Sequence, residues 1–503
     1  MDKPKHSKKH LHQVTEGFQI WGDFISAVPY GSGHINDTYK VTMRVAGTTV
    51  HYLMQRINHE IFTPEPVMEN ITRVTAHLRD KLLPAGGEIS RQTLTVIPAR
   101  DGKPYVRDED GNWWRMYLFI EGAQTYDVIT DARQAFEAAR AFARFQGLLA
   151  DLPSPRLHEI IPGFHNTVRR LEALDAAAEA DVCGRRAAVA AEMAFVDARR
   201  QECARLVERH ERGEIPERIT HNDTKINNVM LDDETGVGVC VIDLDTVMPG
   251  LALYDFGDMV RTATAATQED ERDLSKVSCR INMFEALAEG YLKDATFLLP
   301  SEIEELVFSG RLITLTIGIR FLTDYLAGDT YFRTSRLDQN LDRCRVQFAM
   351  VRSMEEQADA MESIVRNVLG GGRPRPLGRD ERLLVRASRR LPLPENSLPI
   401  TWTFCHTKTV LQPVGRFRRN RRGPWRASVP TSRLPRCARR ESGAATRAQR
   451  GSCHRTPNRV LQRTGKRRCA SVCSSTGGVK AVREAIAYGV KKHDRLRSRR
   501  GRR

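Results

Sequence analysis

The sequence predicts an α+β fold with two lobes, a small β-rich N-terminal lobe and a larger helical C-terminal lobe. Up to about residue 121, apolar and polar residues alternate in short runs, which is typical of half-buried strands. Beyond that point, long alanine-rich stretches repeat their apolar residues with the period of a helix. The 503 residues are 41% hydrophobic and 28% charged, a composition that excludes wholesale disorder.

In the N-terminal lobe we expect an antiparallel sheet of about five strands and one helix. The strands are predicted at 23–30, 38–45, 50–57, 94–98 and 113–120, and the helix at 66–83. The turn Gly31-Ser32-Gly33 separates the first two strands. Residues 1–14 are basic and histidine-rich, and we expect them to form a mobile terminus.

In the C-terminal lobe we expect helices at 131–149 and 167–210, then a compact centre rich in Asp, Asn and Gly at 219–258, and further helices from 269 to 369. Three glycines, 370–372, close the helical pattern. The predicted domains are the N-terminal nucleotide-binding lobe at 15–121, the C-terminal lobe at 122–372 and a tail at 373–503.

The charge of the chain is divided unevenly. Residues 1–372 carry 43 Lys and Arg against 56 Asp and Glu, whereas residues 373–503 carry 36 against 6. The net charge of +17 therefore describes neither the acidic body nor the basic tail. The five cysteines of the body show no pairing pattern, and no apolar stretch of a secretory signal follows the basic start. We expect a cytoplasmic protein without a membrane partner, because the most apolar run, 312–319, is too short to span a bilayer.

The centre of the chain has the H-x-D-x-K-x-x-N spacing of a kinase catalytic loop. It begins at His221 and contains Asp223, Lys225 and Asn228. Asp243 follows at the end of a short apolar strand. In phosphoryl transfer a carboxylate accepts the proton of the attacking hydroxyl, which predicts Asp223 as the base. Lys225 is placed to neutralise charge on the transferring group.

The same pattern predicts a metal site. The phosphates of ATP require Mg²⁺ held by hard oxygen ligands, and Asn228 and Asp243 supply such oxygens. The alternative is an ordinary Asx-rich turn followed by an ordinary buried strand. The order of the two motifs and their place between the lobes favour the kinase hypothesis. Ser32 and Gly33 are predicted to approach the nucleotide phosphates through their backbone, although glycines between strands are commonly hairpin residues.

Four stretches resemble the aminoglycoside phosphotransferase and choline kinase superfamily, and within it the bacterial N-acetylhexosamine 1-kinases: 30–39, 220–228, 242–258 and 319–332. The resemblance covers about residues 15–370 and implies a protein-kinase-like fold, with ATP near a hinge at 117–121. It implies that Asp223 is the catalytic base and that Asn228 and Asp243 hold Mg²⁺. It also implies sugar contacts, which would come from His34, Asn36, Thr246, Arg320 and Tyr331.

Several of these positions have simpler explanations. Arg320 lies on an apolar helical stretch and would there pair with Asp324, four residues on, and Tyr331 would belong to the core. The lysine that protein kinases carry on their third strand is missing, so Gln55 or Arg56 takes its place or nothing does. The acid of the following helix is Glu65 or Glu69, and Asp255 and Asp258 are expected to brace the catalytic loop.

The tail differs in composition from the body, and arginine supplies 31 of its 131 residues. Aromatic residues near arginine clusters suggest nucleic-acid binding, but we expect only non-specific binding of polyanions. The spacing of Cys437, Cys453, His454, Cys469 and Cys473 matches no compact zinc module. We expect the tail to be disordered, and hypothesise that it derives from a frameshift or read-through.

The leading hypothesis is therefore an ATP- and Mg²⁺-dependent kinase for the anomeric hydroxyl of an N-acetylhexosamine. One alternative is a kinase for another small alcohol, such as an amino alcohol, another sugar or an aminoglycoside. A second is nucleic-acid binding through the tail, and a third is a catalytically silent kinase-like module. The complete set of Asp223, Asn228 and Asp243 argues against the third.

Overall fold

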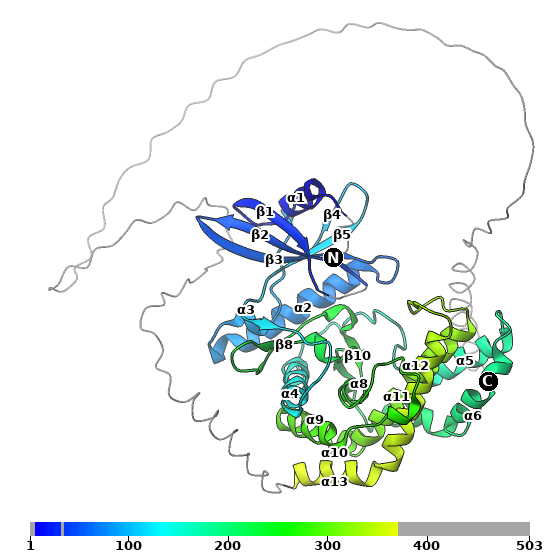
Figure 1. Cartoon of the computed structure of the whole chain (residues 1–503). Helices are drawn as coiled ribbons and strands as arrows, with labels where there is room; N and C mark the ends of the chain where they lie inside the picture. Colours follow the sequence, from blue (N-terminus) through cyan, green and yellow to red (C-terminus); the bar gives the residue numbers. More distant parts are fainter. Residues whose placement is uncertain (1–5, 32–34, 371–503) are drawn as a thin grey trace, which may run out of the picture. The chain divides into compact units, whose positions relative to one another are not determined.

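The computed structural model describes residues 6–31 and 35–370. In the N-terminal lobe an antiparallel sheet has the strand order β1-β2-β3-β5-β4 (Figure 1). Its strands are β1 (Asp23–Pro29), β2 (Asp37–Val45), β3 (Thr48–Ile57), β4 (Val106–Arg107) and β5 (Trp113–Leu118). Along β2 the buried Tyr39, Val41 and Met43 alternate with more exposed residues, which is the period-two pattern read from the sequence.

The fifth strand is not the predicted one. Residues 94–98 form only an isolated bridge, Val96 with Tyr117, and the edge strand is the short β4 instead. Ile97 donates its backbone N–H to Met116, but Pro98 has no N–H to extend the pairing.

The N-terminus also differs from the prediction. Residues Lys8–Glu16 form helix α1, so the expectation of a mobile terminus over 1–14 is wrong for this segment. Leu11 and Val14 are only 1% and 3% exposed and pack against Met54 and Trp114 of the sheet. Two apolar residues at i, i+3 within a basic segment were the sequence signal for this amphipathic turn.

Helix α2 (Pro64–Leu82) follows β3, as predicted, and buries Val67, Ile71, Val74 and Leu78 on one face. It is followed by η1 (Leu83–Ala85) and α3 (Ile89–Gln92), and β5 leads through the hinge segment into β6 (Ala123–Gln124). In its described part, the N-terminal lobe thus consists of one sheet, the helices α1 and α2 and the short helix α3.

The C-terminal lobe is mainly helical, with two small sheets that frame the catalytic loop. One sheet has the order β6-β8-β9 and the other pairs β7 with β10. These strands are β7 (Arg218–Thr220), β8 (Val229–Asp232), β9 (Gly238–Val241) and β10 (Met248–Gly250). The helices are α4 (Ala132–Leu149), α5 (Thr167–Ala180), α6 (Ala190–Asp197), α7 (Arg205–Glu211), α8 (Ala252–Ala263), α9 (Ile281–Asp294), α10 (Pro300–Ile303), α11 (Leu306–Leu326), α12 (Gln339–Glu356) and α13 (Ala358–Leu369).

The long helix predicted at 167–210 is broken into α5, α6 and α7. Asp181 ends α5 in the left-handed region with φ 36°, and Gly184 follows with φ 65°. Short 3₁₀ turns join the pieces: η2 (Arg186–Val189) and η3 (Arg200–Ala204). Alanine-rich periodicity alone did not reveal these breaks, because Asp and Cys interrupt it only briefly.

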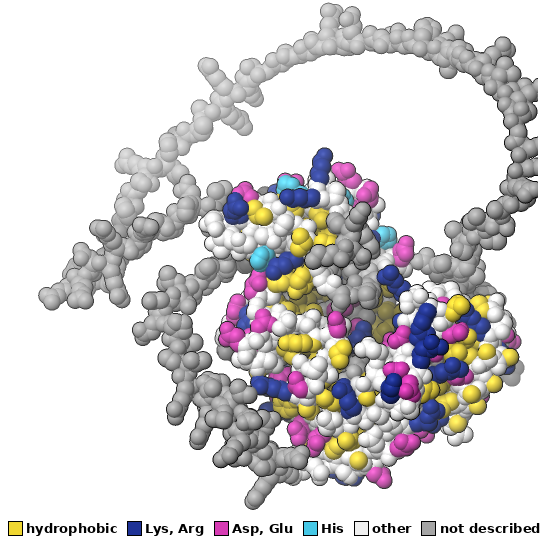
Figure 2. Space-filling view, viewed as in Figure 1, with side chains coloured by type: hydrophobic (Ala, Val, Ile, Leu, Met, Phe, Trp, Pro, Cys, Tyr) yellow, Lys and Arg dark blue, Asp and Glu magenta, His cyan; other side chains and the backbone are white. Residues whose placement is uncertain are grey.

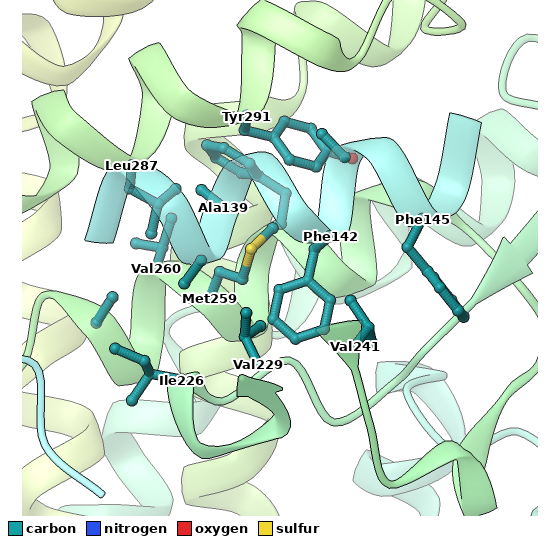
Figure 3. Packing of buried hydrophobic residues seen from close by; sticks show 14 of the residues in the cluster. Ala139, Phe142, Phe145, Ile226, Val229, Val241, Met259, Val260, Leu287 and Tyr291 are labelled. Atoms are coloured by element: carbon teal, nitrogen blue, oxygen red, sulfur yellow. The ribbon is translucent and has the colours of Figure 1, made fainter. Parts of the chain in front are cut away.

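The hydrophobic core of the C-terminal lobe packs against β8 and β9, the two strands that follow the loop of Asp223. Figure 3 shows Phe142 of α4 beside Val229 and Val241 of β8 and β9, with Met259 of α8 close by. Helices α4 and α9 approach closely at Gly290, where a Cβ would lie 2.1 Å from the carbonyl oxygen of Phe136. This packing gives β8 and β9 a rigid support.

Helix α11 is the one helix in the described part of the chain that is long and apolar enough to cross a membrane, with 21 residues and a mean hydropathy of 1.4. The expectation that no apolar stretch reaches this length was therefore wrong. The helix is 78% buried over its most apolar window and packs against α5, α8 and α12. Its apolar surface is thus covered by protein, as in the core helix of a globular lobe.

Candidate functional site

The predicted catalytic residues converge between β7 and β8. The Nζ of Lys225 lies 2.9 Å from Oδ1 of Asp223, and Nδ2 of Asn228 donates to Oδ2 of Asp223 at 3.0 Å. Asn228 lies at the end of the turn η4 (Ile226–Asn228), and its Nδ2 also donates to the backbone oxygen of Asp223. Both oxygens of the predicted base are therefore oriented by neighbours from its own loop.

Two acids of α8 hold the loop from behind, as predicted. Asp255 accepts the backbone N–H groups of His221 and Asn222, at 2.8 and 2.7 Å, and Asp258 accepts that of Thr224 at 3.0 Å. These bonds satisfy backbone groups that the irregular loop leaves without partners. Burial raises the pKa of Asp255 to about 6, although His221 and the donated N–H groups act in the opposite direction.

A buried histidine supports the loop from the other side. His165 is 3% exposed and donates from Nε2 to the backbone oxygen of Asn222 at 3.0 Å. Asn222 precedes Asp223 and has a positive φ of 65°. Burial lowers the pKa of His165 to about 4, so the imidazole is neutral at physiological pH. The neutral ring can therefore hold the strained residue without adding charge next to Asp223.

Asp243 follows β9 and has a left-handed backbone with φ 57°. The N–H of Ile242 donates to the backbone oxygen of Asn228 at 2.9 Å, which joins the end of β9 to the catalytic loop. The surrounding protein raises the pKa of Asp243, and the carboxylates of Asp245 and Asp223 raise it further. A cation between these groups would relieve the repulsion, so the donor set fits a divalent ion.

The oxygen set also fits the hard ligands that Mg²⁺ prefers. Because Asn228 bonds to Asp223 through Nδ2, its carbonyl oxygen remains available for a metal. The site therefore offers an amide oxygen and a carboxylate, Asn228 and Asp243.

A second acid after β9 links the two lobes. Asp245 lies in η5 (Leu244–Thr246) and forms a two-pronged ion pair with Arg115 of β5, with Nη2 and Oδ2 3.1 Å apart. The side chains are 1% and 5% exposed. Asn36 also donates to Asp245, at 2.7 Å, and accepts the N–H of Asn58. The N-terminal lobe therefore reaches this acid at two points.

The positions proposed to replace the missing lysine have other partners. Gln55 lies opposite Arg115 in the sheet, accepts from its Nε at 2.9 Å and donates to Thr38. Arg56 pairs with Asp37 at 2.6 Å. The cation that pairs with Asp245 after β9 is thus Arg115, which was not predicted from the sequence. An arginine inside the apolar run Trp113–Leu118 was the available signal.

The acids of α2 are also engaged elsewhere or exposed. Glu69 lies 2.8 Å from Nε2 of His158, and Glu65 lines a surface cavity beside Trp113. The buried Asn70 connects α2 to the site instead, donating to the backbone oxygen of Val247 at 3.0 Å. Helix α2 is thus joined to the region after β9 by a hydrogen bond from the Asn70 side-chain amide and not by an ion pair.

The predicted sugar contacts are only partly brought together. Ser32, Gly33 and His34 lie outside the described residues. Thr246 donates its hydroxyl to the backbone oxygen of His221 at 2.7 Å, and Asn36 is held by Asp245 and Asn58. These two side chains therefore already have protein partners at the site.

Arg320 and Tyr331 do meet. Nη2 of Arg320 lies 3.4 Å from the hydroxyl of Tyr331, and the guanidinium lies 4.8 Å from the ring centre of Phe164 and 5.3 Å from that of Phe332. Tyr331 is 62% exposed, so the alternative that it belongs to the core is wrong. Burial lowers the pKa of Arg320, and the guanidinium has no ion pair among the described residues.

The alternative partner of Arg320 has a different role. Asp324 accepts the N–H groups of Thr330, Tyr331 and Phe332 and the amide of Asn340. Its carboxylate thus holds the segment after α11 against the helix, so the alternative that Arg320 pairs with Asp324 is wrong. A carboxylate that collects three consecutive N–H groups is a local anchor, and this anchor places Tyr331 beside Arg320.

Comparison with known proteins finds one protein family and several solved structures. The model of the phosphotransferase enzyme family matches residues 26–295. A solved spectinomycin phosphotransferase, in complex with ADP and spectinomycin, is 14% identical with a TM-score of 0.43, over 70% of this chain and 99% of its own. Ethanolamine kinase of Plasmodium vivax is 14% identical with a TM-score of 0.40, over 65% and 82%. Choline kinase of Cryptosporidium parvum is 12% identical with a TM-score of 0.41, over 69% and 93%.

The family match is the comparison that bears on identity. It spans more than half of the chain and includes the catalytic loop, Asp243 and both braces on α8. The chain therefore belongs to the phosphotransferase enzyme family and is an enzyme that transfers a phosphoryl group to a hydroxyl group of a small molecule.

Proposed function

We propose that this enzyme phosphorylates the anomeric hydroxyl of an N-acetylhexosamine, either N-acetylglucosamine or N-acetylgalactosamine, with ATP as the phosphoryl donor. The observation that carries the proposal is the arrangement of Asp223, Lys225 and Asn228 next to Asp243. This arrangement combines a proton acceptor, a cation and two metal ligands within one short loop and the strand end beside it.

In this mechanism Asp223 accepts the proton of the attacking hydroxyl through the oxygen that faces the acceptor. Lys225 and Asn228 hold the carboxylate in place. Although burial lowers the pKa of Lys225, the Asp223 carboxylate outweighs this and raises it, so the amine stays charged and can stabilise negative charge on the transferring group. Asn228 and Asp243 would hold Mg²⁺, which supplies further neutralisation of phosphate charge when bound.

The acceptor class rests on the charge near Arg320. Its guanidinium is surrounded by the rings of Phe164, Tyr331 and Phe332, so a cation already occupies this aromatic cluster. Arg170 adds a second positive charge, and its proximity to Arg320, together with burial, lowers the pKa of Arg170 to about 10. Choline-like and aminoglycoside acceptors carry positive charge and would be repelled here.

A neutral sugar suits the same cluster. The guanidinium can donate to hydroxyl or acetamide oxygens, and the exposed Tyr331 ring can pack against an apolar sugar face. The choice of an N-acetylhexosamine among neutral sugars rests on the sequence resemblance at 242–258 and 319–332.

The nucleic-acid alternative finds no support on the face of the body shown in Figure 2. There, basic and acidic side chains are intermingled over the helical lobe. Nucleic-acid binding proteins instead gather basic side chains into a patch or stripe. The tail, to which that hypothesis refers, lies outside the described residues.

The test is a substrate panel with two matched variants. The enzyme is incubated with ATP, Mg²⁺ and a series of N-acetylhexosamines, other sugars, amino alcohols and aminoglycosides, and NMR identifies the phosphorylated position. We expect a 1-phosphate of an N-acetylhexosamine. Turnover of an amino alcohol or aminoglycoside with a higher kcat/KM would overturn the acceptor assignment.

Arg320→Ala tests the acceptor cluster itself. We expect KM for the sugar to rise much more than KM for ATP, because in this proposal Arg320 contacts the sugar and not the nucleotide. Arg311→Ala is the control, since Arg311 lies on the same helix but pairs with the exposed Glu202. Equal changes in both KM values for Arg320→Ala, or an equal effect of Arg311→Ala, would remove Arg320 from the acceptor site.

A further inference from the structure

A cluster of metal-ligating groups lies in the N-terminal lobe, apart from the catalytic loop. His10 belongs to α1, and Asp108 and Asp110 belong to the turn between β4 and β5. One ligand atom of each residue lies within 4.8 Å of the other two. Nε2 of His10 and Oδ2 of Asp108 are 3.2 Å apart. The turn thus brings two carboxylates to the imidazole of a helix that is distant in sequence.

The imidazole is not satisfied by the protein. Nε2 of His10 is shielded from solvent and has no hydrogen-bond partner in the described part of the chain. Its contact with Asp108 is close but lacks the direction of a hydrogen bond. An unpaired buried polar atom costs about 1 to 3 kcal/mol. A metal ion on Nε2 would supply the missing partner.

The carboxylate of Asp108 is already held in position. It accepts Nε1–H of Trp114 at 2.7 Å and the backbone N–H of Asn112 at 2.8 Å. The side-chain amide of Asn112 also donates to both oxygens of the carboxylate, at 3.2 and 3.0 Å. These three donor groups orient the carboxylate and leave about one of its four lone-pair positions for a metal ion.

The spacing suits a small divalent ion. Ligands about 2.0 to 2.2 Å from a tetrahedral ion lie roughly 3.3 Å from one another. The distance between His10 and Asp108 already meets this, and the exposed Asp110 has room to close the remaining gap. We propose that His10, Asp108 and Asp110 bind a divalent transition-metal ion, with Zn²⁺ as the best match, and that the ion fastens α1 to the β4–β5 turn.

The donor set supports this choice of metal. One imidazole and two carboxylates, without a thiolate, form a ligand set that Zn²⁺ accepts, with water in the remaining position. Mg²⁺ avoids imidazole and prefers oxygen alone. The site is therefore distinct in chemistry from the pair of oxygen ligands at Asn228 and Asp243.

A chain of polar contacts leads from this cluster toward Asp245, one of the acids after β9. Asn112 bonds to Asp108 and lies 3.5 Å from Arg56, and Arg56 pairs with Asp37 at the start of β2. The preceding residue, Asn36, donates to Asp245. The bound ion thus stabilises the lobe that carries the glycine turn, without taking part in phosphoryl transfer.

The first experiment measures Zn²⁺ binding to the full-length, reduced chain by equilibrium dialysis without nucleotide. The wild type is compared with His10→Ala and Asp110→Asn. The controls are His12→Ala and Asp101→Asn. His12 lies on the same helix but stacks on Phe24, and Asp101 lies in a nearby turn beside Lys103.

We expect both cluster variants to bind one Zn²⁺ fewer than the wild type, or to bind it at least about tenfold more weakly. The controls should bind as the wild type does. Any Zn²⁺ bound by the cysteines and histidines of the tail adds equally to the stoichiometry of every protein, because every variant keeps these residues. Equal stoichiometry and affinity in the wild type, His10→Ala and Asp110→Asn would overturn the proposal.

The second experiment detects metal binding at this site by the fluorescence of Trp114, because the centre of its ring lies 5.8 Å from that of His10. Paramagnetic Co²⁺ replaces Zn²⁺ and should quench the fluorescence of this tryptophan in the wild type. His10→Ala should abolish that quenching, whereas His12→Ala should preserve it. Because Asp110 is exposed, Asp110→Asn tests the same loss without disturbing the core. Equal quenching in His10→Ala and the wild type would contradict a site at His10.

Discussion

At the residue scale, Asp223 has a neighbour on each carboxylate oxygen, Lys225 on one and Asn228 on the other. The side chain is therefore oriented before any acceptor binds, which reduces the reorganisation that the reaction requires. The same bonds give the Asp223 side chain a fixed orientation although the residue lies on an irregular loop, as its proposed role of proton acceptor requires.

Asp223→Asn should lower kcat by about 10² to 10⁴-fold, because the amide keeps the shape but cannot accept the proton. The affinity for ATP should change little, since the carboxylate faces the acceptor. Steady-state kinetics together with nucleotide binding measure the two effects separately. Glu234→Gln, in the exposed turn between β8 and β9, is the control and should behave as the wild type. Retention of most of the wild-type kcat by Asp223→Asn would remove it from the role of base.

His165 makes stability depend on pH. Its pKa is about 4 in the folded protein and about 6.5 when unfolded. Between these values the unfolded chain binds a proton that the folded chain does not, so the free energy of unfolding falls as the pH falls, by at most about 1.4 kcal/mol per pH unit. Above pH 6.5 both states are neutral and this effect disappears.

His165→Gln should therefore flatten the dependence of stability on pH between about 6.5 and 4. Glutamine can still donate to the backbone oxygen of Asn222, so the loop keeps its bond. Urea unfolding at a series of pH values gives the slope for each protein. His59→Gln, in an exposed loop, should leave the slope unchanged. An unaltered slope in His165→Gln would mean that this imidazole titrates normally in the folded chain.

At the element scale, the ion pair of Arg115 and Asp245 joins β5 of one lobe to η5 of the other. Its partners come from positions 130 residues apart. Both side chains are buried, so removing one partner leaves an unpaired charge away from water, at a cost of about 3 to 5 kcal/mol. The pair therefore fixes how the lobes meet and where the acids after β9 lie.

Arg115→Met should be strongly destabilised, whereas the double variant Arg115→Met with Asp245→Asn should recover part of the loss. The reason is that the second change removes the buried charge that the first leaves unpaired. The free energy of unfolding in urea checks this order. Arg156→Met, which breaks the largely exposed pair with Glu217, should cost less than about 1 kcal/mol. A double variant less stable than Arg115→Met would show that the buried charge is not the source of the loss.

At the scale of the whole molecule, the catalytic loop, Asp243 and the core that packs against them lie within the described residues, before position 371. The basic charge of the chain is concentrated in residues 373–503. A protein that ends at residue 370 should therefore retain its phosphotransferase activity and its unfolding midpoint. Its retention on a polyanion such as heparin should be lost, since counterion release by basic residues drives that binding. Loss of activity on truncation would show that the tail contributes to the enzyme.

The sequence was sufficient to bring together Asp223, Lys225 and Asn228 and to identify Asp255 and Asp258 as the acids that brace their loop, because these contacts depend on spacing within short segments. It was insufficient for Arg115, Asn70 and His165, whose partners are distant in the chain. It also left a pairing of Arg320 with Asp324 open as an alternative, since spacing at i, i+4 shows which side chains share a face but not where a carboxylate finds backbone N–H groups. Asp324 bonds to the segment after α11 because the backbone N–H groups of Thr330, Tyr331 and Phe332 need an acceptor.

By itself, then, the sequence determined the two-lobed α+β class, the order of most strands and helices and the chemistry of the loop at Asp223. These follow from local periodicity and residue type, which act over a few residues. The tertiary structure alone decided that α1 docks on the sheet, that Arg115 provides the cation beside Asp245 and that Tyr331 lies next to Arg320. Each of these depends on burial and pairing between distant segments, and such pairing is settled only when the chain has packed.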